Sequence, residues 1–417
     1  MDKSWNDIKF KNYSFKQQIL IICTIIYLFT LMVFIESGDT LIYSKIAFLV
    51  TFIACLMNIS KVYLKTQDIC IFVFAVLCLA STLWSPLPEK SMEMGITLAQ
   101  LFLMFVVFRM GFRGFGNEKL FVWIIAISGL GMCIYFLAFY GLSGYLGAMR
   151  GNLRLGSEFE NTNTIGGAAA FVFISILYMG YKSKRLWYLA SIIPLIIMLG
   201  AGSRTAILVS LAGVVIILFN YLFRSEDKNA IKKVLFIIII VSAFVYVLMN
   251  ISEIGFLHST YEHFKQMFDI MSGKSNLVGS TTYRMGMIKV GWQLFLSNPI
   301  VGNGINGTTY ALHAAGIPYT VLHNNYIEIL ADVGLIGFLS YYGVYFLCLK
   351  QAIRQLKRNS FFPLLMLTMM LIIDIGGVTY YMQRNYLFLI FVSIALENDE
   401  EVSQYDSSKK FVFGSRY

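Results

Sequence analysis

The chain has 417 residues, of which 58% are hydrophobic and only 13% are charged. This composition excludes an ordinary soluble globular domain, in which about 25% of residues are charged. It indicates an all-α polytopic membrane protein, because apolar segments of about 20 residues recur along the chain. We attribute the net charge of +10 to membrane topology and expect no nucleic-acid partner.

The apolar segments predict about twelve transmembrane helices. They cover residues 18–35, 41–58, 68–83, 92–108, 119–140, 164–181, 186–201, 205–223, 232–250, 326–348, 361–380 and 384–396. The first segment lacks a cleavage site for a signal peptidase, so we interpret it as a span that stays in the protein. All six cysteines lie within these segments, and no disulfide framework is predicted.

Lys and Arg residues predict the side of the membrane on which each loop lies. With the N-terminus inside, most of the 33 basic residues fall in cytoplasmic segments, as the positive-inside rule requires. An even number of spans then places both termini in the cytoplasm. Five arginines break this bias and are predicted on the outer face, where they are candidates for a functional role: Arg150, Arg154, Arg204, Arg284 and Arg384.

We expect five regions along the chain. These are a transmembrane scaffold (1–140), transmembrane helices with external arginine-bearing loops (141–250), a large external loop (251–322), the C-terminal transmembrane helices (323–397) and a cytoplasmic tail (398–417). Loops as long as 251–322 are usually functional or disordered. Its sequence predicts an amphipathic helix at the membrane interface over 259–271, a second helix over 280–299 and a tight turn at "GNGING".

Three of the outer arginines predict a cationic pocket. Arg204 stands in a Gly-rich hairpin, Arg284 in the first turns of a loop helix, and Arg154 ahead of the polar stretch "GSEFENTN". The planar guanidinium matches phosphate oxygens bidentately, so such a pocket suits a diphosphate. Alternatively, each arginine pairs with a carboxylate such as Glu158 or Glu160, or with anionic lipid. For Arg150 and Arg384 this alternative is favoured.

The stretch "LHNNYIEILADVGLIGF" (322–338) contains a candidate base. His323 can be neutral near pH 7 and accept a proton from a hydroxyl, or it can share a capping role with Asn324 and Asn325. Glu328 and Asp332 lie on one helix face and could hold His323, an arginine or a sugar hydroxyl. Further along, Asp374 is either part of the site or the buried partner of an arginine.

Neither a metal nor another cofactor is predicted. The chain has four histidines, and no histidine and carboxylate pair has the spacing of metal ligands.

Four motifs follow one another in an order that resembles the O-antigen ligase and polymerase superfamily. They are an "RL-G-F-NTN" pattern (Arg154–Asn163), "GSRT" (Gly202–Thr205), "YRMGMIKVGWQLFLSNPIVGNGIN" (Tyr283–Asn306) and "HNNYIEILADVGLIGF" (His323–Phe338). The resemblance covers roughly residues 150–345. It implies a metal-independent glycosyltransferase of the C-type architecture, acting on undecaprenyl-diphosphate-linked glycans at the outer face of the bacterial inner membrane.

The resemblance also implies roles for residues. Arg204 and Arg284 would hold the diphosphate, and His323 would serve the acceptor hydroxyl. We place six more residues at the substrate-binding surface: Arg154, Asn163, Tyr283, Asn324, Glu328 and Asp332.

The expected function is polymerisation of lipid-linked oligosaccharide repeat units of the O-antigen or capsule type. A chain-length regulator protein is a partner that such a polymerase could have. Two alternatives are an O-antigen ligase, which would transfer the glycan to lipid A core, and an oligosaccharyltransferase, which would transfer it to a protein hydroxyl. A lipid or polysaccharide transporter is the alternative from another class, but it should show internal repeats and polar helices near the midplane, which the sequence does not.

Overall fold

The computed structural model describes residues 10–34, 41–149, 155, 162–183, 186–224, 280–356 and 360–397. Throughout these ranges the chain forms helices joined by turns, without a strand. The span predicted at 232–250, the helix predicted at 259–271, Arg150, Arg154 and the tail 398–417 lie outside them. The described ranges agree with an all-α membrane protein.

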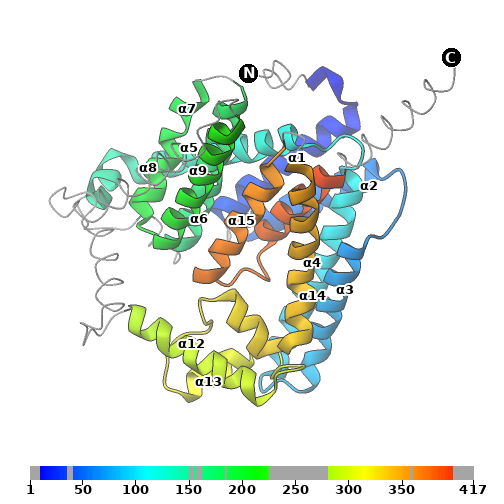
Figure 1. Cartoon of the computed structure of the whole chain (residues 1–417), viewed down its shortest axis with the longest axis vertical. Coiled ribbons are helices and arrows are strands. Elements are labelled where there is room, and N and C mark those ends of the chain that lie inside the picture. The colour runs from blue at the N-terminus through cyan, green and yellow to red at the C-terminus, as the bar shows by residue number, and fades with distance from the viewer. Residues whose placement is uncertain are drawn as a thin grey trace.

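The helices follow one another along the chain as a bundle (Figure 1). The first group is α1 (Phe15–Val33), α2 (Leu41–Asn58), α3 (Thr66–Ala80), the 3-10 turn η4 (Ser81–Leu83), α4 (Pro88–Gly111) and α5 (Glu118–Met149). The second group is α6 (Thr162–Lys182), α7 (Leu186–Ala190), α8 (Ile192–Ala201) and α9 (Arg204–Arg224). The third group is α12 (Ser280–Ser297), α13 (Gly307–Ala314), α14 (Asn325–Gln355), α15 (Phe362–Gly376) and a last helix over 383–397.

Eight helices in the described ranges are long and apolar enough to cross a membrane. Each overlaps a predicted span, although the last one, Asn325–Gln355, continues beyond the predicted end at residue 348. The predicted span 186–201 is instead divided at Ser191 into α7 and α8, and α15 has only 15 residues. The expected total of twelve spans therefore remains a prediction.

The bundle has two chemically different ends. α12 and α13 lie together at one of them (Figure 1), and with the segment 298–324 they form what we call the loop end. The opposite end, which we call the basic end, contains the connections 59–65 and 112–117 and the C-terminal end of α14. Among its basic residues are Lys61, Lys65 and Arg113. The positive-inside rule predicts that the basic end faces the cytoplasm.

Helix α14 is longer than a single span and is broken near its start. Its 31 residues extend about 46 Å at 1.5 Å per residue, whereas the hydrocarbon core is only about 30 Å thick. Gly334 has φ 66° and ψ −166°, which interrupts the helix. The part before this break, with Glu328 and Asp332, can therefore extend beyond the lipid at the loop end.

The segment 299–304 inserts into the break in α14. The amides of Asn303 and Gly304 donate to the carbonyls of Ala331 and Asp332 at 3.0 and 2.8 Å. In return, the amides of Leu335 and Ile336 donate to the carbonyls of Pro299 and Ile300 at 2.8 and 3.2 Å. Backbone groups that the break would leave without partners are thus satisfied.

The turn between α3 and α4 supports the same segment from the other side. Ser81 Oγ accepts a hydrogen bond from the amide of Ile305 at 3.0 Å, and Ser85 Oγ donates to the Ile305 carbonyl at 2.7 Å. Ser91 Oγ donates to the same carbonyl at 2.5 Å. The N-terminal region, for which the sequence predicts only a scaffold, therefore holds the loop end in place.

Candidate active site

His323 lies immediately before α14 in an unusual backbone conformation. Asn324 is the N-cap of the helix, and its side chain accepts a hydrogen bond from the amide of Ile327 at 3.0 Å. The capping role is therefore filled without His323. His323 has φ 53°, a left-handed conformation that only a few per cent of non-glycine residues adopt.

A cavity lies beside His323 at the loop end. Its volume is about 90 Å³, and its wall includes Asn163, Thr205, His323 and Arg384. These residues come from the starts of α6, α9, α14 and the last helix, and the turn 376–382 after α15 completes the wall. Of the predicted site residues, the fold thus brings His323 and Asn163 together, with Thr205 next to Arg204.

Arg284 and Tyr319 lie near His323 but do not line the cavity. The rings of Tyr319 and His323 meet edge to face, with 5.9 Å between their centroids. Burial lowers the pKa of His323 below its ordinary value, and the nearby Arg284 guanidinium lowers this pKa further. The imidazole is therefore neutral at pH 7 and able to accept a proton.

The predicted arginines have different positions in the structure. Arg204 begins α9 directly after Gly202 and Ser203, as the Gly-rich hairpin predicts, and Gly202 ends α8 with φ 60°. Arg284 lies in α12 and is half-buried. Tyr283 lies next to it in the same helix. Arg154 lies outside the described residues.

Arg384 is the residue that sequence reasoning set aside and the structure places in the cavity wall. Only 2% of its surface is exposed, and its Nη1 donates to the carbonyl of Thr164 in the first turn of α6 at 3.3 Å. Its position at the start of a predicted span was a usable signal, because arginines at membrane depth usually have a function.

Helix N-termini add to the positive charge that Arg384 brings to the cavity. The N-termini of α6, α9 and the last helix border it, and a helix N-terminus carries about half a positive charge. Together with Arg384, these termini favour an anionic group such as a phosphate.

Glu328 and Asp332 hold the loop end together through backbone groups. Glu328 Oε2 accepts a hydrogen bond from the amide of Leu322 at 2.6 Å. Asp332 accepts from the amides of Thr308 and Asn306 at 2.9 and 3.3 Å. Both side chains are buried and absent from the residues that line the cavity. In the structure they position the chain around His323.

Asp374 belongs to a network that shapes the cavity wall. It accepts hydrogen bonds from Tyr342 at 2.9 Å and from Thr379 Oγ1 at 2.5 Å, with Asn325 Nδ2 at 3.4 Å. Asn325 Oδ1 in turn accepts from the amides of Thr379 and Tyr380 at 2.8 and 3.0 Å. Among the described residues, no arginine forms an ion pair with Asp374. Instead, it holds the turn 376–382 against α14.

Comparison with known proteins supports the resemblance noted in the sequence. A search of curated proteins gives no significant match. Residues 189–342 match the family model described as O-antigen ligase. The match contains Arg204, Arg284, His323 and the broken helix α14 up to Tyr342, and it ends before Asp374 and Arg384. Residues 189–342 are thus similar to the O-antigen ligase family, in a chain that has eight described helices long and apolar enough to cross a membrane.

Proposed function

We propose that the protein polymerises glycan repeat units carried on undecaprenyl diphosphate. The observation that carries this proposal is the cavity at the loop end, where His323 lies among three helix N-termini and close to Arg284, with Arg384 in the wall. A neutral base beside a cationic pocket is what the attack of a hydroxyl on a sugar diphosphate requires. Both groups lie at the end predicted to face away from the cytoplasm.

The proposed reaction is a single displacement. His323 takes the proton of the acceptor hydroxyl while the hydroxyl oxygen bonds to C1 of the donor sugar. The bond between C1 and the diphosphate oxygen breaks, and the configuration at C1 inverts. Arg204, Arg284 and Arg384 stabilise the negative charge that develops on the leaving diphosphate, a role in which one lost donor typically costs about a hundredfold or more in rate.

The small size of the cavity decides how much of the substrate it can hold. Typical ligand pockets measure about 300–1,000 Å³, and this one measures about 90 Å³. It therefore suits a phosphate and the reacting end of one sugar. The remaining glycan would extend past α12 and α13, and the polyprenyl chain would lie in the bilayer.

The experiment is a reconstitution of purified protein with lipid-linked oligosaccharide. The wild type should produce longer glycan and release undecaprenyl diphosphate. In Arg204→Ala and Arg284→Ala the rate of glycan transfer should fall at least a hundredfold. Arg204→Lys should recover only part of the rate, because lysine cannot bind bidentately. Arg113→Ala, at the basic end, is the control. Wild-type chain lengths from either of the two alanine variants would rule out the diphosphate assignment.

The same assay separates the alternative functions. Product on lipid A core alone would identify a ligase, and product on an added protein acceptor an oligosaccharyltransferase. A transporter would change the side of the membrane on which the substrate lies and would make no new glycosidic bond.

A further inference from the structure

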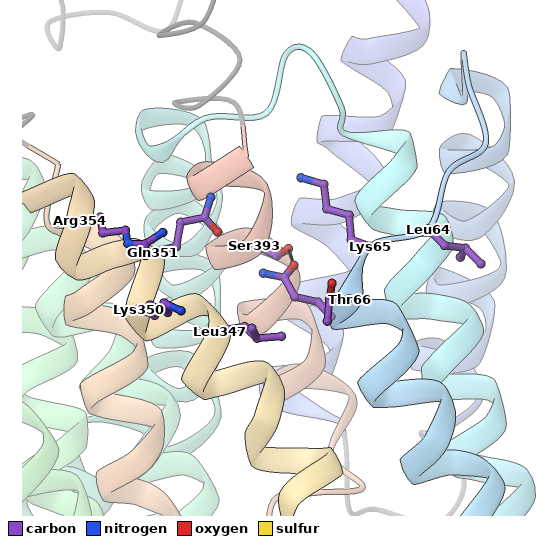
Figure 2. A pocket seen from close by; sticks show the side chains of 9 residues that line it. Leu64, Lys65, Thr66, Leu347, Lys350, Gln351, Arg354 and Ser393 are labelled. Atoms are coloured by element: carbon purple, nitrogen blue, oxygen red, sulfur yellow. Dashed lines mark hydrogen bonds between the residues drawn. The ribbon is translucent and has the colours of Figure 1, made fainter.

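A second hollow lies at the basic end, and it shares no lining residue with the cavity of the candidate active site. Its volume is about 420 Å³. Figure 2 shows α14 with Lys350, Gln351 and Arg354 on one side and the segment before α3 with Leu64 and Lys65 on the other. Ser393 of the last helix lies between them. The hollow therefore lies where α3, α14 and the last helix meet.

The two basic residues of α14 are not neutralised by carboxylates. Lys350 and Arg354 are four residues apart, so they lie on one face of the helix, and both are exposed. Within the described ranges, no carboxylate lies at ion-pair distance from either side chain. Across the hollow, Lys65 is bound to Glu397 at 3.1 Å. The rim thus has two positive charges available to an anion.

The floor of the hollow is polar and fixed. Gln67 and Ser393 are buried, with 7% and 2% of their surfaces exposed. Ser393 Oγ donates to Gln67 Oε1 at 2.5 Å, and Gln67 Nε2 donates to Cys348 Sγ at 3.3 Å. A polar floor below a basic rim suits a phosphate group better than an acyl chain.

Both α3 and α14 carry exposed apolar side chains. On α3 these exposed side chains are Ile69, Phe72, Val73 and Val76, and on α14 they are Leu339 and Phe346. In a bilayer such surfaces contact acyl chains. A ligand with a phosphate at one end and acyl chains at the other would match both the hollow and these surfaces.

We propose that this hollow binds the phosphate headgroup of an anionic phospholipid from the leaflet at the basic end. Basic pockets between transmembrane helices on the cytoplasmic side have this function in other membrane proteins. A soluble phosphate ester shares the same anionic chemistry, but it would leave the exposed apolar faces of α3 and α14 unused. This binding is independent of glycan transfer at the loop end.

The test is native mass spectrometry of the full chain, delipidated in detergent and titrated with phosphatidylglycerol. One lipid should bind with preference over phosphatidylcholine. In the double variant Lys350→Gln/Arg354→Gln the affinity for phosphatidylglycerol should fall at least fivefold. Lys16→Gln/Lys61→Gln removes two exposed charges from the same end outside the hollow and should retain it. All four side chains are exposed, and equal thermal midpoints would confirm that both variants fold.

Three results would overturn the proposal. Equal loss in both double variants would mean that the basic end attracts anions without a defined site. Equal binding of phosphatidylcholine would mean that charge does not select the ligand. Displacement of the bound lipid by millimolar glycerol 3-phosphate would show that the hollow takes a soluble phosphate ester. Glycan transfer measured on the same variants should remain at the wild-type rate, which separates this site from the proposed polymerase activity.

Discussion

His323 combines a left-handed backbone, partial burial and a neighbouring guanidinium. Asparagine adopts the same backbone conformation readily, but it cannot accept a proton. His323→Asn should therefore keep the fold while the rate of glycan transfer falls at least a hundredfold. Thermal unfolding and the reconstituted assay together check this. A variant that is both stable and active would show that His323 is not the base.

The depressed pKa of His323 predicts the pH dependence of the reaction. Because the neutral imidazole is the active form, the rate should be constant above neutral pH and fall in acid, with a midpoint below the ordinary histidine pKa of about 6.5. Arg284→Gln removes a positive charge, so the pKa of His323 should rise and the acid limb of the residual activity should move to higher pH. Initial rates across this range measure both midpoints. An unchanged acid limb in the variant would show that Arg284 does not act on His323.

Glu328 should act on His323 through the backbone. Glu328→Ala leaves the buried amide of Leu322 without its partner, which costs about 1–3 kcal/mol, and should lower both the thermal midpoint and the transfer rate. Glu328→Gln retains an acceptor oxygen and should recover most of both. If Glu328 instead binds sugar, both variants should raise KM while the thermal midpoint stays at the wild-type value.

At the scale of elements, the break in α14 explains why these carboxylates can exist in an apolar helix. The sequence could place Glu328 and Asp332 on one face by their spacing. It could not reveal their partners, which are backbone amides of a distant loop. Likewise, Arg384 becomes a wall residue only because the turn 376–382 brings the last helix beside α6. Contacts of this kind depend on tertiary packing and leave no local periodicity.

The glycine at the break can be tested against a matched glycine. A Cβ on Gly334 would lie 2.4 Å from the Ile300 carbonyl oxygen, whereas one on Gly316, with φ 71°, would meet nothing within 4 Å. Both substitutions place alanine at a positive φ, which costs about 1–3 kcal/mol, but only Gly334→Ala adds a collision. Its thermal midpoint should therefore fall well below that of Gly316→Ala. Similar midpoints would mean that the segment 299–304 can move away from α14 at little cost.

At the scale of the whole molecule, a buried ion network joins the first and last parts of the chain. Arg109 is fully buried at the end of α4. Its Nε contacts Asp68 Oδ1 at 3.0 Å, and its Nη1 contacts Glu397 Oε2 at 3.4 Å. Because Arg109 follows the predicted span 92–108, the positive-inside rule assigns it to a cytoplasmic loop. The structure gives it an interior role, which charge bias along a sequence cannot distinguish from a loop position.

Replacing Arg109 should strongly destabilise the folded protein. Arg109→Ala leaves the buried carboxylate of Asp68 without its cation, while Glu397 keeps only Lys65. Breaking a buried ion pair in this way typically costs about 3–5 kcal/mol. We expect loss of folded protein in detergent, measured by size-exclusion chromatography and thermal unfolding. Lys61→Ala removes one exposed positive charge at the same end and should behave as the wild type. A stable Arg109→Ala variant would mean that other groups compensate Asp68 and Glu397.

The serine contacts to Ile305 also have a consequence for biosynthesis. Ser81 and Ile305 are 224 residues apart, and ribosomes add about 5–20 residues per second. The turn between α3 and α4 therefore emerges roughly 10–45 s before the segment it must hold. During this interval its hydroxyl groups lack their final partner. The loop end is thus completed late in synthesis, and the region 189–342 alone would lack the support that arrives first.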